Sequence, residues 1–420
     1  MLSAFSPCAR ADRNAEGSTI RIDTPWQDDP AFKRVVTAIS AAGGEVRVVG
    51  GAVRDCLLQR PVGDIDMATS LLPEAVIAAA RAAGLKSVPT GVDHGTITVI
   101  AQGTPFEITT LRADVETDGR RAVVSFTTDW ARDAMRRDFT INALYLDPDG
   151  ELHDPLGQGL DDLKAQVIRF IGSAAERIRE DYLRILRFYR FHAMLGWPIL
   201  DRSGAAACAT HLDGLQRLSV ERIWQEMAKL LAAPDPSPML AEMTDVGILA
   251  AIASELDTGR ALPATRDAIL RLAAMLPDQA AASAISGRWK LSKADVRRLV
   301  LAVQDPADAL INPAATRIAL YRDGRQAMLD RSVLATAHGE SVDSEVQALI
   351  ADWPIPVFPL KGRDLMTANI RPGPEMGELL HRLEARWIAD DFRADRAQCL
   401  TWLADEIRDP AGRGSIPPSG

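Results

Sequence analysis

The feature that most constrains the fold of this chain is a pair of adjacent glycines, Gly50 and Gly51, which follows the apolar run at residues 46–49. A short apolar run of this kind is typical of a buried strand, and a short helical pattern comes next, so the glycines stand where a strand turns into a helix. Backbone amides at such a turn can face phosphate oxygens, and the absent side chains let a phosphate come close. The sequence therefore predicts a phosphate-binding turn early in an α/β unit.

Two carboxylates follow this turn, Asp64 and Asp66, separated by Ile65. On a strand, this spacing puts both carboxylates on one face while Ile65 points into the core. Carboxylates side by side repel each other, and a bound cation relieves the repulsion. Oxygen ligands on a rigid strand suit Mg²⁺, and a pair of such ions can stabilise the attacking and leaving oxygens of nucleotidyl transfer. Either feature alone is usually a plain turn or a solvated loop, but together they predict Asp64 and Asp66 as metal-binding, catalytic residues.

In this order and spacing, the residues resemble the first signature of the family that contains the CCA-adding tRNA nucleotidyltransferases and the bacterial poly(A) polymerases. The resemblance is to the class II nucleotidyltransferases. Three further blocks match in the same order: RRDFTINAL at residues 136–144, DPLGxGxxDL at 154–163 and EDxxRxLRxxRF at 180–191. These blocks cover roughly the first half of the chain, and a weaker likeness continues at residues 361–365 and 372–377. The resemblance implies an α/β N-terminal head with a small mixed β-sheet, of the polymerase-β-like nucleotidyltransferase palm type, followed by an all-α neck, body and tail.

The pattern along the chain agrees with this architecture. A helical pattern at residues 30–42 precedes short apolar runs at 46–49, 64–68, 95–101, 105–111, 123–126 and 142–146, which favour strands. Beyond residue 154 the spacing is helical, and proline clusters at 233–238 and 353–359 mark boundaries. The expected segments are a flexible N-terminal arm at 1–23, the catalytic head at 24–150, a helical neck with base recognition at 151–233, a helical body at 234–352, a helical tail that binds tRNA at 353–408 and a disordered tail at 409–420.

Further site residues are expected in the head. Glu107 alternates with the apolar residues Phe106 and Ile108, so it lies on the opposite face of its strand, where it can complete a three-carboxylate site or stand as a partly exposed acid. The polar segment 113–122, which contains Arg120 and Arg121, is expected to be a mobile loop beside the site.

The triphosphate is expected to bind the Gly51 amides and Arg54, because a guanidinium fork matches phosphate oxygens. Asp55 is expected to orient Arg54 or to cap the helix. The resemblance implies that Arg137 binds nucleotide. For Asp138, the preferred role is a buried ion pair with an arginine. The side-chain amide of Asn142 could reach a ribose hydroxyl.

Base selection is the sharpest hypothesis. Asp181, Arg184, Arg187 and Arg190 recur every three residues, so on a helix they form one slowly turning ridge. Asp181 can accept from the exocyclic amine of adenine or cytosine while Arg184 donates to the adjacent ring nitrogen, which would disfavour uracil and guanine without a template. An arginine-rich ridge, including Arg177 and Arg179, is more commonly a solvated face, but the corresponding residues of the family bind nucleotide.

The composition limits which partners and which location are expected for this chain. A net charge of -9 and a pI near 5.3 argue against unspecific coating of nucleic acid, so contact with the acceptor arm and 3′ end of tRNA requires local basic surface. The four cysteines are far apart, which indicates neither a disulfide framework nor a zinc site. No signal-like or membrane-length apolar stretch occurs, so a cytoplasmic location without membrane contact is expected. The oligomeric state is not indicated.

The resemblance implies template-independent addition of C, C and A to tRNA 3′ ends from CTP and ATP, with two Mg²⁺ ions and release of pyrophosphate. The alternatives are a poly(A) polymerase, an enzyme that adds only CC or only A, and a catalytically silent protein that binds RNA or nucleotide on the same fold. Against the poly(A) alternative, the extra basic segment after the Asp pair and a basic C-terminal extension are missing. Against the silent protein, adjacent repelling carboxylates need a function.

Overall fold

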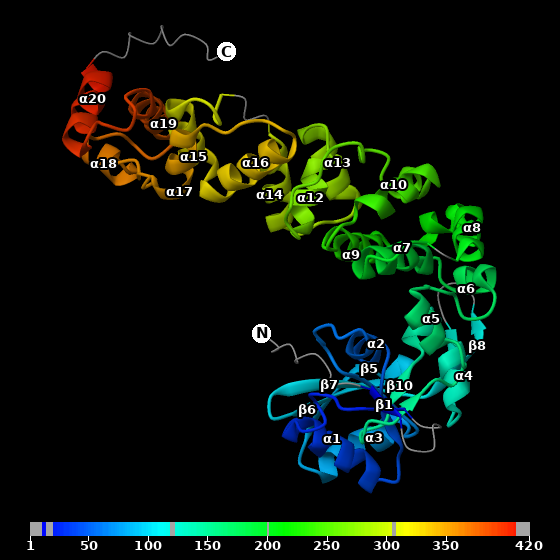
Figure 1. The fold of residues 1–420 in the computed structure, drawn as a ribbon. Coiled ribbons are helices and arrows are strands. Elements are labelled where there is room, and N and C mark those ends of the chain that lie inside the picture. The colour runs from blue at the N-terminus through cyan, green and yellow to red at the C-terminus, as the bar shows by residue number, and fades with distance from the viewer. Residues whose placement is uncertain (1–10, 14–19, 118–121, 200, 305–307, 409–420) are drawn as a thin grey trace. The chain divides into compact units, whose positions relative to one another are not determined.

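The fold is described from a computed structural model over residues 11–13, 20–117, 122–199, 201–304 and 308–408. The chain divides into two compact units, Met1–Ser254 and Glu255–Gly420 (Figure 1). The first unit contains a mixed β-sheet followed by helices, and the elements described in the second unit are helices. The expected order of an α/β head followed by helical segments is confirmed.

The centre of the first unit is a seven-stranded sheet in the order β11-β10-β3-β4-β7-β6-β5. Within it β4 runs parallel to β7, and the other neighbouring pairs are antiparallel. This pairing places the end of β3 beside the start of β4, so the Gly50-Gly51 turn lies next to Asp66. The strands are β3 (Val46–Val49), β4 (Asp66–Thr69), β5 (Lys86–Gly91), β6 (Thr96–Ala101), β7 (Thr104–Thr110), β10 (Tyr145–Leu146) and β11 (Leu152–His153).

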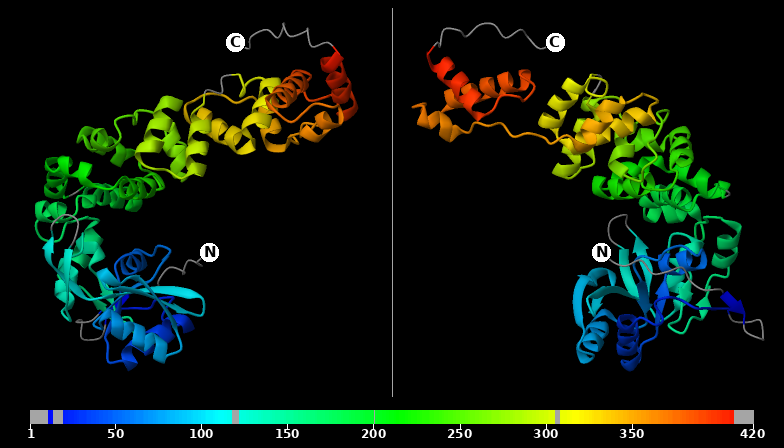
Figure 2. Two further views of the ribbon diagram at one scale, coloured as in Figure 1. Left: turned by 180° about the vertical axis from the view of Figure 1, so that it is seen from behind. Right: turned by 60° about the vertical axis from the view of Figure 1, so that its left-hand side comes forward.

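Helices α1 (Pro30–Ala41) and α3 (Pro73–Ala82) pack side by side on one face of this sheet (Figures 1 and 2). Helix α1 begins where sequence chemistry favours it, because Pro30 fits the first turn and the Asp29 carboxylate accepts from the amides of Ala31 and Phe32. Its Phe32 packs against Phe106 of β7, with ring centroids 6.3 Å apart.

The opposite face of the sheet carries a second apolar cluster that includes Val49, Ala68 and Tyr145. Helix α4 (Trp130–Met135) contributes Ala134 to this cluster and Trp130 to its border. The other elements of the first unit are β1 (Ala11–Arg13), β2 (Ile20–Ile22), α2 (Gly51–Leu57), β8 (Arg112–Thr117), β9 (Ala122–Phe126), α5 (Gly159–Ala165), α6 (Ala174–Glu180), α7 (Leu183–Leu195), α8 (Arg202–Thr210), α9 (Val220–Leu231), α10 (Ser237–Asp245) and α11 (Ile248–Ile252), with 3₁₀ turns at Val92–His94, Thr140–Asn142 and Leu212–Arg217.

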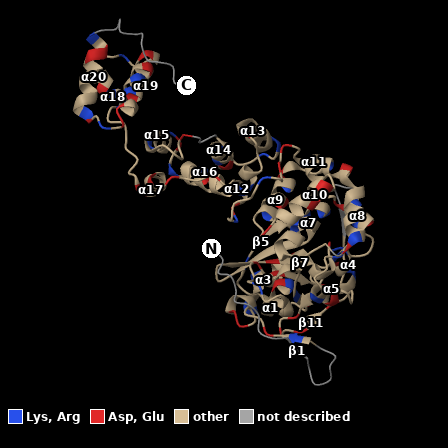
Figure 3. Cartoon of the chain, turned by 45° about the horizontal axis from the view of Figure 1, so that its top comes forward, with Lys and Arg blue, Asp and Glu red and all other residues tan. Residues whose placement is uncertain are grey.

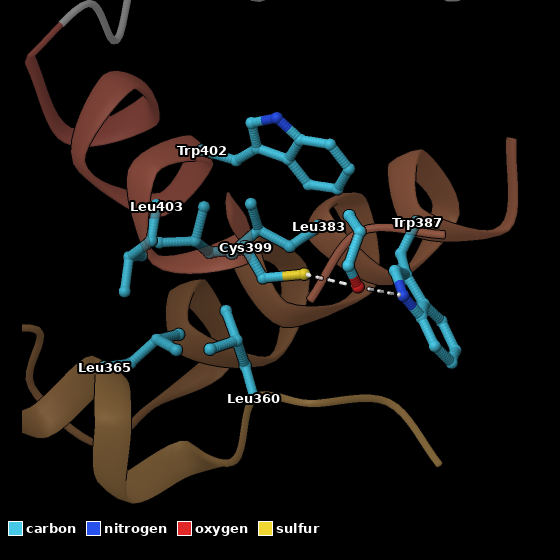
Figure 4. Packing of buried hydrophobic residues seen from close by; sticks show 9 residues of the cluster. Leu360, Leu365, Leu383, Trp387, Cys399, Trp402 and Leu403 are labelled. Atoms are coloured by element: carbon cyan, nitrogen blue, oxygen red, sulfur yellow. Dashed lines mark hydrogen bonds between the residues drawn. The ribbon is translucent and has the colours of Figure 1, made fainter. Parts of the chain in front are cut away.

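The second unit is built from packed helices. Near its C-terminal end, Leu365, Leu383 and Trp387 form a buried cluster in which the Trp387 indole donates to the Ala394 carbonyl at 2.9 Å (Figure 4). Figure 3 shows acidic and basic residues on helices of both units. The helices are α12 (Ala268–Ala274), α13 (Gln279–Arg288), α14 (Lys293–Val303), α15 (Pro313–Asp323), α16 (Arg325–Ala337), α17 (Ser344–Asp352), α18 (Gly362–Thr367), α19 (Pro374–Ala389) and α20 (Arg396–Arg408).

Most expected elements of the head are found, with three corrections. The strand expected at 64–68 begins only at Asp66, so Asp64 precedes it. In the segment expected as a loop at 113–122, the described residues 113–117 and 122 belong to the antiparallel strands β8 and β9. The strand expected at 142–146 is reduced to Tyr145–Leu146 and follows a 3₁₀ turn. Arg120 and Arg121 lie outside the described residues.

Other expectations concern the termini, the cysteines and the membrane. Within the expected arm, β1 pairs with β2, and the rest of residues 1–19 and residues 409–420 lie outside the described ranges. Cys208 and Cys399 are buried and free, whereas Cys56 is disulfide-bonded, which the wide spacing of the cysteines in the sequence did not indicate. Distance along the sequence does not set the distance between two cysteines in a fold.

Over the ranges described, none of the helices combines the length and the apolar character that crossing a membrane requires.

Candidate active site

The turn between β3 and α2 is formed by Gly50 and Gly51. Gly50 has φ 75° and ψ -125°, a conformation open to glycine, and its amide donates to the Leu144 carbonyl at 3.3 Å. A Cβ atom added at Gly50 would lie 3.7 Å from the Arg137 Nη1, and one added at Gly51 would lie 3.8 Å from the Arg54 Nη2. Two guanidinium groups therefore border the turn.

Arg54 is buried and is held from two sides. Its Nε and Nη2 donate to the two carboxylate oxygens of Asp55, each at 2.9 Å, and its Nη1 donates to the Asn142 Oδ1 at 2.7 Å. Asp55 thus orients Arg54, as the sequence predicted. A paired and buried guanidinium loses little conformational freedom when it meets an anion.

Asn142 has both ends of its amide engaged within the protein. Its Oδ1 accepts from Arg54, and its Nδ2 donates to the Asp138 Oδ1 at 3.0 Å. In this arrangement Asn142 positions Arg54, and its expected contact with a ribose hydroxyl stays a prediction. Asp138 is itself buried and accepts from Arg187 Nε at 2.8 Å, so its expected role in an ion pair is confirmed, with Arg187 as the partner.

Arg137 is held by a different set of groups. Its Nη2 donates to the Asp133 Oδ2 at 3.0 Å, and its Nε donates to the Tyr145 hydroxyl at 3.1 Å. Although burial alone would raise the pKa of Asp133, Arg137 and Arg136 hold this pKa at about 2, with help from the Tyr145 hydroxyl. Asp133 is therefore ionised at neutral pH, and the charge of Arg137 is fixed beside the turn.

The predicted carboxylates gather at the same edge of the sheet. Asp66 and Glu107 are paired residues of the parallel strands β4 and β7, and Asp64 lies just before β4. All three side chains reach solvent, whereas Ile65, Phe106 and Ile108 are buried. Two sequence expectations hold: Glu107 lies opposite its apolar neighbours, and Ile65 points inward.

The charges of these acids act on one another. The surrounding protein partly desolvates the Asp66 carboxylate, and the negative charges of Glu107 and Asp64 add to this effect, so the pKa of Asp66 rises to about 6. Among the residues described, no three His, Cys, Asp or Glu side chains already stand as ligands around one point. The donor set still fits a hard divalent cation, because it consists of carboxylate oxygens whose repulsion such an ion would relieve.

Three residues of the ridge expected on one helix, Arg184, Arg187 and Arg190, lie on helix α7, whereas the fourth, Asp181, lies outside it. Helix α6 ends at Glu180, and Asp181 has an extended backbone, with φ -152° and ψ 104°, before α7 begins. The prediction that all four residues share a helix is therefore wrong for Asp181. Its Oδ2 accepts from Arg222 Nη2 at 2.7 Å, and its Oδ1 accepts from the Leu183 amide at 3.1 Å.

The arginines of this region are largely paired within the protein. Arg184 donates to the Glu180 carboxylate at 2.6 Å and to the Arg136 carbonyl at 3.1 Å. Arg190 lies 2.6 Å from a Glu226 carboxylate oxygen and stacks over Phe191 at 4.0 Å. Burial lowers the pKa of Arg190 to about 10. The region is thus a network of ion pairs and not the solvated face that composition alone would suggest.

Several residues of this network were missed by the sequence analysis. Asp133 was readable, because it lies three and four residues before Arg136 and Arg137, the sequence spacing that is typical of helical ion pairs, although helix α4 ends at Met135. Glu226 and Arg222 come from α9, which the sequence does not connect with α7. Only the tertiary packing of these helices brings them to Arg190 and Asp181.

A glycine turn bordered by two paired arginines lies beside the carboxylates of Asp64, Asp66 and Glu107, and this arrangement is that of a nucleotidyltransferase. Three family models match it: "Poly A polymerase head domain" at residues 46–169, "Probable RNA and SrmB-binding site of polymerase A" at 200–259 and "tRNA nucleotidyltransferase domain 2 putative" at 262–403. The chain belongs to the family of CCA-adding tRNA nucleotidyltransferases.

Its relatives cover nearly the whole length. The mitochondrial CCA tRNA nucleotidyltransferase 1 of Danio rerio is 34% identical over 86% of this chain and 87% of its own. A CCA-adding enzyme of Limosilactobacillus fermentum is 34% identical over 92% and 99%, respectively. Among solved structures, the Bacillus stearothermophilus CCA-adding enzyme in complex with CTP matches with a TM-score of 0.75 and 27% identity, over 92% of this chain and 100% of that chain.

Proposed function

We propose that this chain adds C, C and A to the 3′ end of tRNA from CTP and ATP and releases pyrophosphate. The observation that carries the proposal is the placement of the phosphate turn and the three carboxylates at one edge of the sheet. The relatives named for CCA addition match nearly the whole chain and support the choice of substrates.

Asp64, Asp66 and Glu107 are proposed to hold Mg²⁺. When bound there, the metal would lower the pKa of the attacking 3′ hydroxyl and neutralise charge on the leaving pyrophosphate. Asp66 and Glu107 supply oxygen ligands from two neighbouring strands, so their backbones are held by the sheet, and Asp64 supplies its carboxylate from just before β4. The raised pKa of Asp66 reflects the crowding of negative charge that a cation would offset.

The triphosphate is proposed to lie against the Gly51 amide between Arg54 and Arg137. Arg54 is anchored by Asp55 and Asn142 and so presents a fixed positive charge. This charge would bind phosphate oxygens and hold the α-phosphate in line with the 3′ hydroxyl.

Asp181 and Arg184 are proposed to read the base, with Arg187 and Arg190 holding helix α7 in place through Asp138 and Glu226. Each carboxylate oxygen has two lone pairs, so Asp181 can accept from an exocyclic amine while it stays paired with Arg222. Uracil lacks that amine and guanine places an acceptor there, so both would leave polar groups unpaired.

The base-reading proposal is tested by Asp181→Ala. The variant is expected to relax discrimination of CTP and ATP against UTP and GTP while the apparent Mg²⁺ affinity stays unchanged. Asp245→Ala, which removes an exposed acid at the end of α10, serves as the control. Unchanged discrimination in Asp181→Ala would refute the pairing role.

The reaction itself is tested by incubating the protein with Mg²⁺, labelled CTP and ATP, and tRNA that lacks its CCA end. We expect incorporation of both labels and a 3′ end that reads CCA. Addition of A alone to any RNA 3′ end would favour a poly(A) polymerase, the alternative that the head-domain family model keeps open. Incorporation of neither label would favour a protein that only binds RNA or nucleotide.

The helical segments beyond the head are proposed to bind the acceptor arm of tRNA through its phosphates and shape. A cytoplasmic location is also proposed, consistent with the absence of a membrane-spanning helix over the described residues.

A further inference from the structure

A closed set of hydrogen bonds surrounds Arg137. Its Nε donates to the Tyr145 hydroxyl at 3.1 Å, its Nη2 donates to the Asp133 Oδ2 at 3.0 Å, and the Tyr145 hydroxyl donates to the same Oδ2 at 2.7 Å. The hydroxyl thus accepts from the guanidinium and donates to the carboxylate. These bonds define both the rotation of the guanidinium plane and its distance from the sheet.

The bonds also decide which edge of Arg137 faces the nucleotide turn. Because Nε and Nη2 are directed to Tyr145 and Asp133, Nη1 is the nitrogen on the other side. It lies 3.7 Å from the position that a Cβ atom would take at Gly50. The guanidinium therefore faces the turn with its Nη1 nitrogen, because the contacts of Nε with Tyr145 and of Nη2 with Asp133 fix its orientation.

The two holding residues are themselves fixed. Asp133 and Tyr145 are fully buried, and Trp130 packs against the Tyr145 ring in an edge-on contact at 5.3 Å. The second oxygen of Asp133 accepts from Arg136 Nε at 2.8 Å and from the Arg112 amide at 3.3 Å. Burial raises the pKa of Tyr145, so its hydroxyl keeps its proton and remains the donor to Asp133. A side chain held by such a shell needs little reorganisation when it meets its ligand.

We propose that Tyr145 and Asp133 are positioning residues for the triphosphate: they hold Arg137 with Nη1 toward the Gly50-Gly51 turn. The inference rests on the proposed function, in which Arg137 binds the triphosphate. It goes further, because it assigns a role in nucleotide affinity to a tyrosine and an aspartate that need not touch the nucleotide. A purely structural role for the same pair would affect folding but would not depend on Arg137.

The test is a double-mutant cycle on CTP binding by the full-length protein, measured calorimetrically without tRNA. Arg137→Ala is expected to weaken binding strongly. Tyr145→Phe, which removes only the hydroxyl, is expected to weaken binding about tenfold, because a hydrogen bond to a charged group is lost. In the Arg137→Ala background the same change is expected to have no further effect. Tyr321→Phe is the matched control, since the Tyr321 hydroxyl also donates to a carboxylate, that of Glu384, in the second unit.

The outcomes separate the inference from the proposed function. Unaltered CTP binding in Arg137→Ala would remove Arg137 from the triphosphate site and so contradict that part of the proposed function. If Arg137→Ala weakens binding but Tyr145→Phe binds like the wild type, or if the two losses add in the double variant, the positioning role is overturned. Melting temperatures identify a variant that fails to fold. In that case Asp133→Asn replaces Tyr145→Phe, with the same expected loss and the same dependence on Arg137.

Discussion

Two arginines border the Gly50-Gly51 turn, and each is held by acidic or polar side chains. Arg54 is paired with its neighbour Asp55 and with Asn142, whereas Arg137 is paired with Asp133 and Tyr145. Removing one member of such a buried set leaves the others unsatisfied, so its cost exceeds that of the single bond. At the scale of single residues, nucleotide affinity should therefore depend on the side chains that pair with these two arginines, even where they do not touch the nucleotide.

A buried histidine in helix α7 makes stability depend on pH. His192 lies inside helix α7, where its Nδ1 is 3.1 Å from the Trp197 carbonyl and its ring packs edge-on against Phe188. Burial lowers the pKa of His192 from 6.5 to about 4, against the opposing effects of the Trp197 carbonyl and Asp201. Between these two pH values the unfolded chain binds a proton that the folded chain excludes. The free energy of unfolding should thus be fully retained above about pH 6.5 and fall as the pH decreases toward 4.

The measurement is urea unfolding of the wild type and of His192→Gln between pH 7.5 and 4.5. We expect the wild type to lose on the order of 2–3 kcal/mol more than the variant across this interval. Parallel pH profiles for the two proteins would show that His192 is not the group responsible.

At the scale of elements, the β3–α2 turn depends on its first glycine. The φ of 75° and ψ of -125° at Gly50 belong to a backbone region that residues other than glycine avoid, whereas Gly51 lies within the helix. Gly50→Ala is expected to lower the free energy of unfolding by about 1–3 kcal/mol. Gly51→Ala is the matched control and is expected to keep stability within about 0.5 kcal/mol. Denaturant titration of both variants checks the difference, and equal losses would contradict it.

The elements also show how far the sequence could be interpreted. Alternation predicted that Glu107 would lie opposite Phe106 and Ile108, because the period of a strand is a local property. The register that pairs Asp66 with Glu107 is not local, since it depends on how β4 and β7 meet. In the same way, the three-residue recurrence of Asp181, Arg184 and Arg187 suggested one helix, but the extended backbone at Asp181 interrupts it.

The partners of the site residues were the least predictable part. Residue types indicated a nucleotide site, but the choice of Asp133 for Arg137 and of Glu226 for Arg190 follows from helix packing. A sequence motif gives the functional groups, whereas the fold determines which groups are paired inside the protein and which remain for the substrate.

At the scale of the whole molecule, all proposed catalytic and nucleotide-binding residues lie in the first unit. A fragment that ends at Ser254 is therefore expected to bind CTP with an affinity within about threefold of the full chain. It should extend tRNA with a much higher KM, because the helices of the second unit, which belong to the segments proposed to bind the acceptor arm, are absent. Calorimetry with CTP and steady-state extension of tRNA check the two parts. Equal KM values for tRNA would remove the second unit from substrate binding.

The central claim is that Asp64 and Asp66 tolerate their mutual repulsion because a divalent ion binds between them. A crystal structure with Mn²⁺ and a non-hydrolysable CTP analogue tests it directly, since anomalous scattering locates the metal. The account predicts a metal bound to both carboxylates and to phosphate oxygens of a nucleotide lying against the Gly51 turn. An ordered nucleotide at the turn with no metal at either carboxylate would contradict it.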